Sequence, residues 1–341
     1  MYRIGIIGCG KIAQVRHIPE YLANPDTEIT ALYDLNTGRA RSLADSLNAS
    51  ACTSVDELLD ADLDAVSVCT SNDSHAEITI RALKKGLDVL CEKPMATRLE
   101  DAKAMAEAAR ESGKVLMIGQ NQRLNGTHVR ARELIRRGEI GKVISFQTVF
   151  AHGGPETWSV DPGRNTWFFD RKKAVMGAMA DLGIHKTDLI RFLLDDDVAG
   201  VSACLATLDK KGADGTPIAV DDNAFVIYRM KSGVIGTMKA SWTNYGEEDN
   251  STLIFGQDGV MKIFASPEHS IEIVKASGER DYYDVEKIQT NDSQTSSGVI
   301  DAFVRSLKAR RAEISADDVL RSMDAVFAAI RSSEERREIE L

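Results

Sequence analysis

The sequence predicts an α/β protein in which an N-terminal doubly wound parallel sheet precedes a C-terminal α+β domain with a large, mostly antiparallel open sheet. Three features lead to this prediction. Apolar strand-like segments alternate with helical segments up to about residue 120, a glycine-rich turn follows the first segment, and strand-like runs joined by short turns begin near residue 199. A chain of 341 residues is too long for one ordinary core, so we expect two domains, residues 1–121 and 122–341.

The strands of the first domain are expected to lie inside a sheet that helices cover. Each strand is apolar almost throughout, and helical segments such as residues 75–86 and 99–113 separate them. A strand that is apolar on both faces needs cover on both faces, which parallel sheets obtain from their connecting helices. The segments expected to form this sheet are RIGIIG, EITALYD, DAVSVCT, DVLCEK and KVLMIGQ.

The second domain has a different order of elements. A helical segment at residues 127–138 precedes a long alternating strand at 142–152, and a loop rich in Gly, Pro and Trp leads to a helix near 178–194. Turn signals such as KSG and QDG join the strands that follow, and short connections favour antiparallel pairing. These strands are VSACLATL, NAFVIYRM, GVIGTMKASWT, STLIFGQ, GVMKIFA and SIEIVKA, and two helical segments at 298–310 and 316–338 close the chain.

The composition excludes several classes of partner. Lys and Arg number 42 against 52 Asp and Glu, a net charge of −10, whereas nucleic acids and anionic membranes attract basic surfaces. The chain begins directly with a strand-like segment and has no long apolar run that could span a membrane. Its five cysteines never form a C-x-x-C pair and lie mostly in apolar strands, so we expect them to be reduced. These features predict a cytoplasmic protein with a small or nucleotide-sized ligand.

A dinucleotide-binding motif follows the first strand. Gly8, Gly10 and Ala13 form G-x-G-x-x-A at a strand-to-helix turn that also contains Lys11 and Ile12. The first glycine allows the tight turn, the second lets a pyrophosphate approach the backbone at the helix N-terminus, and the small third residue lets helix and strand pack closely. A glycine turn without a ligand is the alternative, but the strand, turn and helix context favours a dinucleotide.

Asp34 bears on which dinucleotide binds. It ends the second strand, about 20 residues after the glycine motif, where a carboxylate accepts hydrogen bonds from the hydroxyls of the adenosine ribose. Because the same carboxylate repels a 2′-phosphate, we expect NAD as the cofactor and NADP as the less favoured one. Arg39 or Arg41 could still turn toward a 2′-phosphate, so NADP stays open.

Polar residues that end the later strands are expected to face the same cofactor, because ligands of open parallel sheets bind at the carboxyl edge. His75 lies in a first helical turn and could equally be structural, and Ser74 with Glu77 has the spacing of a capping box. The residues expected at the cofactor are Gly8, Gly10, Lys11, Ile12, Asp34, Thr70, Ser71, Asn72, His75, Glu92, Lys93 and Gln120.

Lys93 ends the strand DVLCEK within the short motif Glu92, Lys93, Pro94. At the carboxyl edge it would lie beside the expected nicotinamide, and a lysine buried there needs a partner or a ligand. An ordinary strand-end ion pair with Glu92, worth little in stability, is the alternative. The motif therefore allows Lys93 either to contact the reacting oxygen of a substrate or to make an ion pair.

Asp181 and His185 are four residues apart at the start of a helical segment, so they lie on one face, and Asp188 falls nearly on that face. A histidine that titrates near neutral pH can take or give a hydroxyl proton, and a carboxylate can orient it. A helix-surface pair and a metal site are the alternatives. A metal is disfavoured because no third histidine or cysteine accompanies the pair at ligand spacing.

These three motifs, in this order, resemble those of the glucose-fructose oxidoreductase, inositol dehydrogenase and MocA (Gfo/Idh/MocA) family. They lie at residues 8–13, 92–94 and 177–188, and the similarity covers almost the whole chain. The resemblance implies a Rossmann domain followed by an α+β domain whose open sheet mediates homo-oligomers, so we expect a homodimer or homotetramer. It also implies NAD(P)-dependent oxidation or reduction of a sugar, cyclitol or related alcohol.

By this resemblance, Lys93, Asp181 and His185 match the catalytic residues. His185 would be the general base in oxidation, Lys93 would bind and stabilise the reacting oxygen, and Asp181 would hold the imidazole. The loop WSVDPGRNTWFFD is expected to contribute to the substrate wall. Substrate contacts are expected from Lys93, Trp158, Arg164, Asn165, Trp167, Asp181 and His185, with no metal.

The chain departs from the family in one place. A run of glycines is common there, but this chain keeps only Gly177 in AVMGAMAD, so Val175 and Met176 could narrow or reshape the substrate pocket. Two other functions stay open, namely a glycosidase that uses tightly held NAD for transient oxidation, and a dinucleotide-binding sensor without turnover. The expected function is hydride transfer between nicotinamide and a secondary alcohol or ketone of a sugar, cyclitol or sugar derivative.

Overall fold

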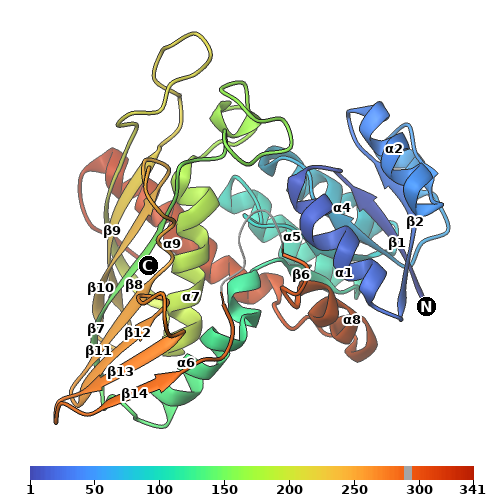
Figure 1. Cartoon of the computed structure of the whole chain (residues 1–341). Helices are drawn as coiled ribbons and strands as arrows, with labels where there is room; N and C mark the ends of the chain where they lie inside the picture. The colour runs from blue at the N-terminus through green and yellow to red at the C-terminus, as the bar shows by residue number, and fades with distance from the viewer. Residues whose placement is uncertain (288–293) are drawn as a thin grey trace.

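The computed structural model describes residues 1–287 and 294–341. Its strands form one sheet of six and one of nine, and Figure 1 shows the smaller sheet on the side of the N-terminus and the larger one on the opposite side. Helix α7 (Ile184–Leu194) lies on the inner side of the larger sheet. The predicted fold class, a parallel sheet followed by a mostly antiparallel one, is confirmed.

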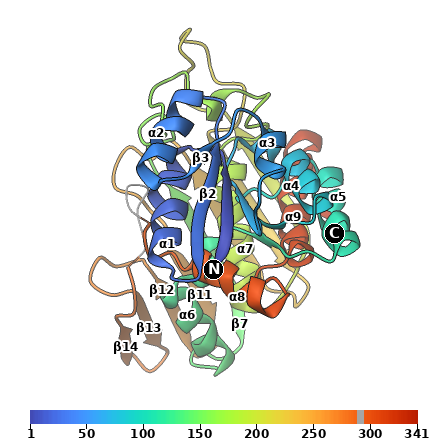
Figure 2. The same ribbon diagram turned by 90° about the vertical axis from the view of Figure 1, so that its right-hand side faces the viewer.

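The first sheet is parallel throughout, with the order β3-β2-β1-β4-β5-β6. The strand order reverses between β1 and β4, which places a ligand crevice beyond the carboxyl ends of these strands. Figure 2 shows helices α1 (Ile18–Ala23) and α4 (His75–Lys84) on opposite sides of the sheet. The strands are β1 (Tyr2–Ile7), β2 (Thr27–Tyr33), β3 (Ser50–Ala51), β4 (Ala65–Val68), β5 (Asp88–Cys91) and β6 (Leu116–Ile118).

Three more helices complete the cover of this sheet, and the glycine turn leads into a short π-helical segment. The burial of β4 and β5 on both faces explains why their sequences are apolar almost throughout. These segments are η1 (Ala13–His17), α2 (Thr37–Leu47), α3 (Val55–Leu59) and α5 (Leu99–Ser112).

The second sheet has the order β14-β13-β12-β11-β7-β10-β9-β8-β15. Its described pairs are antiparallel except for β7 with β10, which run parallel in the centre of the sheet. The strands are β7 (Val143–Ala151), β8 (Val198–Ala206), β9 (Asn223–Met230), β10 (Ile235–Ser241), β11 (Thr252–Gly256), β12 (Gly259–Ile263), β13 (Ile271–Lys275), β14 (Arg280–Tyr283) and β15 (Ile339–Glu340).

Helices cover the inner face of this sheet. Helix α6 (Gly126–Arg136) packs against β12, α7 against β7, and α9 (Ala316–Glu335) against β8. Burial alternates along β9, where Val226 and Tyr228 are buried while Phe225 and Ile227 are exposed. This period of two shows that one face of the sheet packs against the helices and the other faces outward.

Helix α8 (Val299–Ala309) follows most strands of the second sheet in sequence but packs against helix α1 of the first domain. The side chain of Glu20 in α1 accepts the backbone N–H of Ile300 at 3.1 Å, and Asn24 at the end of α1 donates to Asp301 at 2.7 Å. The division into two domains, residues 1–121 and 122–341, remains a proposal. None of the described helices is both long and apolar enough to cross a membrane.

Candidate active site

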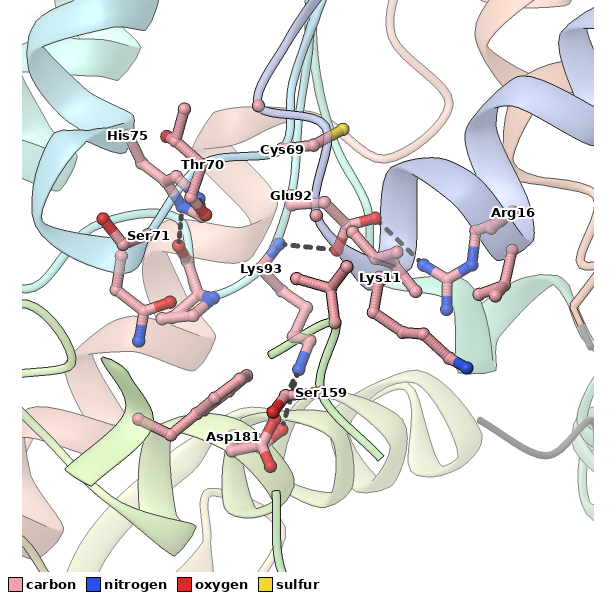
Figure 3. Close-up of a pocket in the computed structure, with 18 of the residues that line it drawn as sticks. Lys11, Arg16, Cys69, Thr70, Ser71, His75, Glu92, Lys93, Ser159 and Asp181 are labelled. Atoms are coloured by element: carbon pink, nitrogen blue, oxygen red, sulfur yellow. Dashed lines mark hydrogen bonds and ion pairs between the residues drawn. The ribbon is translucent and has the colours of Figure 1, made fainter. Parts of the chain in front are cut away.

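A cavity of about 600 Å³ lies at the carboxyl edge of the first sheet and extends toward α7 and the long loop that follows β7. Figure 3 shows residues of the glycine turn and of the segments that follow β4 and β5 on one side of it, and Asp181 of the second domain on the other. The cavity therefore joins the expected cofactor residues to the expected catalytic residues.

The glycine turn is shaped for a ligand. Gly8 has φ +93°, and a Cβ on it would lie 2.7 Å from the carbonyl carbon and oxygen of Cys69. A Cβ on Gly10 would meet no atom within 4 Å, so the space beside its backbone is open for a pyrophosphate. Ala13 is fully buried, as expected where the helix and strand pack closely, and Lys11 and Ile12 line the cavity. These features fit a dinucleotide.

Asp34 ends β2 at the rim of the same cavity and also fixes the glycine turn. Its Oδ2 accepts the backbone N–H of Cys9 and its Oδ1 accepts that of Asn36, both at 2.7 Å. Arg39 Nη1 lies 3.6 Å from Asp34 Oδ1. The carboxylate is therefore anchored by backbone groups on two sides while it lines the cavity where the ribose is expected.

The polar residues after β4 lie where the sequence places them. Thr70, Ser71, Asn72 and His75 all line the cavity. Asn72 Nδ2 also donates to the carbonyl of Ala174 at 3.2 Å, which ties this segment to the second domain.

His75 has a structural role in addition to its place in the cavity wall. Its Nδ1 lies 2.8 Å from the carbonyl oxygen of Pro94 and its Nε2 lies 3.1 Å from that of Thr70. Burial lowers the pKa of the imidazole, although these carbonyl contacts oppose the shift. The ring thus links the segment after β4 to the end of β5.

Two other details differ from the expectation. Ser74 Oγ donates to Thr70 Oγ1 at 2.7 Å and to the Ser71 carbonyl at 2.9 Å and caps no helix N–H, while Glu77 pairs with Arg81, so the capping box was wrong. Gln120 is buried but is not among the described residues that line the cavity. Local spacing cannot show that a serine hydroxyl prefers neighbouring acceptors of its own turn.

Glu92 and Lys93 have different partners from those expected. Glu92 Oε1 accepts hydrogen bonds from Arg16 at 2.9 Å and contacts His17 Nε2 at 2.8 Å. Burial alone would raise the pKa of the Glu92 carboxyl. The positive charge of Arg16 and the hydrogen bond to His17 outweigh the effect of burial and hold that pKa well below its usual range. The side chain of Glu92 is therefore a buried anion paired with Arg16. From Lys93 it accepts a hydrogen bond from the backbone N–H and none from the ammonium group.

Lys93 reaches across the cavity to Asp181, which stands in the π-helical segment η5 (Met179–Gly183) before α7. Its Nζ donates to Asp181 Oδ1 at 2.9 Å and to the Asp181 carbonyl at 3.1 Å, as Figure 3 shows. Asp181 Oδ2 accepts the indole N–H of Trp242 at 3.1 Å. Two of the three ammonium hydrogens of Lys93 are thus used, and one remains for a substrate oxygen.

His185 follows one turn later and lines the same cavity. Its ring packs on Phe150, with centroids 5.8 Å apart, and its Nδ1 has no partner among the described atoms although it is buried. Burial, together with the charges of Lys93 and Arg16, lowers the pKa of the imidazole well below its usual value. Asp181 bonds Lys93 and Trp242 rather than this ring, so the structure gives Asp181 a different contact from the predicted one.

Asp188 is turned away from the cavity. Both of its carboxylate oxygens accept hydrogen bonds from Arg123 at 2.5 Å, and Oδ1 also accepts from Ser322 at 2.8 Å. It therefore joins α7 to α9 and to the segment before α6, which is a structural role.

Half of the expected substrate wall lines the cavity. Trp158 and Trp167 do so, and both pack on Phe168, with ring centroids 5.2 Å and 3.9 Å away. Arg164 and Asn165 are exposed and lie outside the described lining. The loop thus presents Trp158 and Trp167 to the cavity, together with Ser159 and Asp161, while Arg164 and Asn165 face solvent.

The packing explains why this chain keeps a glycine at position 177. A Cβ at Gly177 would lie 1.7 Å from the carbonyl oxygen of Asp221, so the one glycine retained is the one that the packing requires. Val175 and Met176 do not line the cavity among the described residues, which gives no support to the expectation that they narrow it.

Sequence reasoning missed several residues that line the cavity or lie beside it, among them His152, Arg16 and Lys186. His152 ends β7 and lines the cavity, and because its Nδ1 accepts the Gly154 N–H at 2.9 Å, its proton is assigned to Nε2. Arg16 is buried beside Glu92. Lys186 is fully buried, donates to the Asn250 carbonyl at 2.9 Å, and has its pKa lowered to about 7, chiefly by burial. His152 could have been found as a polar residue ending an alternating strand, whereas nothing local marks a buried Arg or Lys.

Several buried acceptors at the inner end of the cavity have no partner among the described atoms. His128 Nδ1 contacts the Gln122 carbonyl at 2.8 Å, which leaves Nε2 as an unpaired acceptor. Gln122 Oε1 and Asn121 Oδ1 are also unpaired. These three atoms are closed off from water as well as unpaired, so they add no acceptor to the surface of the cavity. The described residues contain no group of three His, Cys, Asp or Glu side chains that could hold a metal ion.

Comparisons with known proteins show the family of the chain. Residues 2–120 match the model of an oxidoreductase family with an NAD-binding Rossmann fold, and residues 128–262 match the GFO/IDH/MocA C-terminal domain. The chain is 34% identical to 1,5-anhydro-D-fructose reductase of Ensifer adhaerens over 71% of this chain and 70% of that protein. It is 27% identical to myo-inositol 2-dehydrogenase of Thermotoga maritima over 99% of this chain and 98% of that protein.

A solved structure has the same fold over the full length. GenD2 from gentamicin A biosynthesis, in complex with NAD, is 25% identical and superposes with a TM-score of 0.85 over 100% of this chain and 96% of that one. The glycine turn, the Lys93–Asp181 pair and the two matched domains lead to one assignment. This chain is a member of the Gfo/Idh/MocA family of NAD-binding oxidoreductases.

Proposed function

We propose that this protein interconverts a secondary alcohol and a ketone on an uncharged sugar, cyclitol or sugar derivative, with NAD as the cofactor. The observation that supports this most directly is the convergence of Lys93 and His185 in one cavity with the open backbone of the glycine turn. A basic imidazole and a cationic donor near one point are the groups needed to remove a hydroxyl proton and stabilise the oxygen.

Bound NAD supplies the acceptor for the hydride that leaves the carbinol carbon. In oxidation, the neutral imidazole of His185 takes the hydroxyl proton, which is possible at neutral pH because its pKa is lowered. The remaining N–H of Lys93 donates to the same oxygen and stabilises the negative charge that develops on it. In reduction, His185 returns the proton.

Asp181 positions Lys93 in this scheme. Its carboxylate and its backbone carbonyl both accept from Lys93 Nζ, and Trp242 holds the carboxylate in turn. With two contacts fixed, the third N–H of the ammonium group has a defined direction. This arrangement limits the reorganisation needed when the oxygen becomes charged.

The lining favours an uncharged polyhydroxylated substrate. Two cations that line the cavity are already paired, Lys93 with Asp181 and Arg16 with Glu92, while Lys173 is exposed at the rim. Trp158 and Trp167 line the cavity and offer apolar surface to a sugar ring. The two relatives named above are a reductase of an anhydro sugar and a dehydrogenase of inositol.

NADH formation tests this proposal. We expect a panel of inositols, hexoses and anhydro sugars to include compounds that give one NADH per ketone formed, with weaker turnover of sugar phosphates and sugar acids. Product without NADH would indicate a glycosidase, and tight sugar binding without turnover would indicate a sensor. The relatives reported above are dehydrogenases and reductases and lend no support to either alternative.

We also propose that the protein works in the cytoplasm as a homodimer or homotetramer. All five cysteines are free thiols, and four of them are buried, which suits a reducing compartment. Exposed apolar residues on the outer face of the second sheet, such as Phe225 and Ile227, support the oligomer.

A further inference from the structure

The cavity extends to the carboxyl end of β2, where Arg39 of α2 meets Asp161 of the loop that follows β7. Arg39 Nη2 donates to both carboxylate oxygens of Asp161, at 2.8 Å each. On its other side, Arg39 Nη1 lies 3.6 Å from Asp34. The Arg39 side chain is 19% exposed and that of Asp161 is 77% exposed, so the contact lies at the rim.

This arrangement places one cation between two carboxylates at the point where the adenosine ribose is expected. An arginine near this position is what accommodates the 2′-phosphate of NADP in such folds. Arg41, the other arginine considered from the sequence, is exposed and outside the described lining. Arg39 is thus well placed to meet a 2′-phosphate, but its guanidinium is already engaged by Asp161.

We propose that Asp161 is a second determinant of dinucleotide choice, which disfavours NADP by occupying Arg39. A 2′-phosphate would have to displace the Asp161 carboxylate and then lie near two negative charges. The ribose hydroxyl of NAD requires neither change. Because Asp161 belongs to the same loop as Trp158, the substrate domain takes part in selecting the adenosine end of the cofactor.

This inference depends on the dinucleotide site of the family and is independent of the sugar proposed above. Equilibrium binding tests it without any substrate, so a failure here and a failure to find an active sugar are separate results. Asp161 is exposed, and its described side-chain contact is with Arg39, so its replacement is not expected to unfold the protein.

The experiment is isothermal titration calorimetry of NAD⁺ and NADP⁺ with the unmodified protein and with Asp161→Asn and Asp161→Ala. We expect both variants to bind NADP⁺ more tightly by roughly fivefold to tenfold, the scale of a partly exposed charge pair, with less than a twofold change for NAD⁺. Asp170→Asn is the matched control, because it removes one exposed carboxylate from the same loop away from Arg39. It should leave both affinities unchanged.

A double variant decides whether the gain acts through Arg39. Adding Arg39→Met to Asp161→Asn should abolish the tighter NADP⁺ binding, because the cation that was released is then absent. Equal changes in the affinities for NAD⁺ and NADP⁺ would overturn the proposal and show that Asp161 only holds its loop in place. An unchanged NADP⁺ affinity in Asp161→Asn would also overturn it.

Discussion

Lys93 makes an ion pair and still retains a donor for the reaction, so its two possible roles are not exclusive. The partner of its side chain is Asp181, 88 residues away, rather than the adjacent Glu92. Glu92 instead pairs with Arg16 and contacts His17. The contact with Asp181 therefore positions Lys93 across the cavity.

We expect Lys93→Met to lower kcat by roughly 100-fold or more, because one preorganised donor to the developing charge is lost. NAD affinity should change little, since the dinucleotide is expected to be held mainly at the glycine turn and Asp34. Steady-state kinetics on the best sugar and calorimetry of NAD⁺ measure the two effects. His185→Ala should cause a similar loss, and the double variant should be far less than multiplicatively worse, because both residues act on one oxygen.

Lys173→Met is the control for this prediction. Lys173 also lines the cavity but is exposed at its rim, and its side chain lies outside the proposed machinery. It should retain near-normal turnover. Near-normal turnover in Lys93→Met would instead show that Lys93 makes only a structural ion pair.

The lowered pKa of His185 predicts the pH dependence of alcohol oxidation. The neutral imidazole is the active form, and a group whose pKa lies below the usual 6.5 stays neutral until the pH falls well below that value. We therefore expect kcat/KM for oxidation to be constant as the pH falls from 8 through 6.5 and to decline only in more acidic solution. A pH profile at saturating NAD measures this.

A second basic group could obscure that profile. The pKa of Lys186, next to His185, is lowered to about 7, so its charging could produce an inflection of its own. The profile of Lys186→Met separates the two, because an inflection that disappears in this variant belongs to Lys186. An inflection near pH 6.5 that persists would contradict the lowered pKa of His185.

At the scale of elements, Asp34 connects the end of β2 to the glycine turn. It accepts the N–H of Cys9 and of Asn36, so it supports the turn as well as the expected ribose contact. We expect Asp34→Ala to narrow the difference in affinity between NAD and NADP, because the repulsion of a 2′-phosphate is removed. It should also lower the free energy of unfolding by about 1–3 kcal/mol, since buried N–H groups lose their acceptor.

Asp34→Asn separates these two effects. Its amide oxygen can still accept one of the two N–H groups, so the stability loss should be smaller while the narrowing remains. Calorimetry of both dinucleotides and urea denaturation measure the two quantities. Equal affinities for NAD and NADP in the unmodified protein would contradict the assigned role of Asp34.

The sequence predicted the elements better than their arrangement. Strands such as β4 and β9 were recognisable because their burial follows a simple pattern, continuous in one and alternating in the other. The edge strand β14 was missed because its four residues, Arg280–Tyr283, have no apolar period. The parallel pairing of β7 with β10 could not be predicted, since sequence neighbours suggest only hairpin pairing.

The site was predictable where a motif sits at a strand end, and not where long side chains cross the cavity. Gly8, Gly10 and Asp34 are placed by the backbone, so their positions follow from the fold. The spacing of Asp181 and His185 suggested that one holds the other, but Lys93 and Trp242 reach Asp181 from distant segments. The Lys93 contact depends on how the two domains meet, and the Trp242 contact on how distant segments of the second domain pack.

At the scale of the whole molecule, the outer face of the nine-stranded sheet is the feature that calls for a partner. Phe225, Ile227 and Ile235 are 44%, 51% and 50% exposed. Ile227 lies opposite Thr237 of the neighbouring strand β10, and Ile235 pairs with Ser145 of β7, so these residues share the outward face in the middle of the sheet. Exposed apolar side chains gathered on one face of a sheet often mark a surface that binds another protein.

We expect this face to bury itself against a second copy of the chain. A symmetric pair would place the same residues of two sheets in contact, which is the commonest arrangement in homo-oligomers. Light scattering at micromolar concentration should therefore give the mass of a dimer or tetramer. The variant Phe225→Glu with Ile227→Glu should shift it toward the monomer, because charges buried at such an interface would lack partners.

Leu208→Glu provides the matched control, because Leu208 is an exposed apolar residue that lies beyond the end of β8, outside the described strands. It should keep the mass of the unmodified protein, so loss of the oligomer only in the Phe225 and Ile227 variant would locate the interface on the sheet. Circular dichroism should be the same for all three proteins, since the replaced side chains point away from the core. A strictly monomeric unmodified protein, or an unchanged mass in the double variant, would show that this face is not the interface.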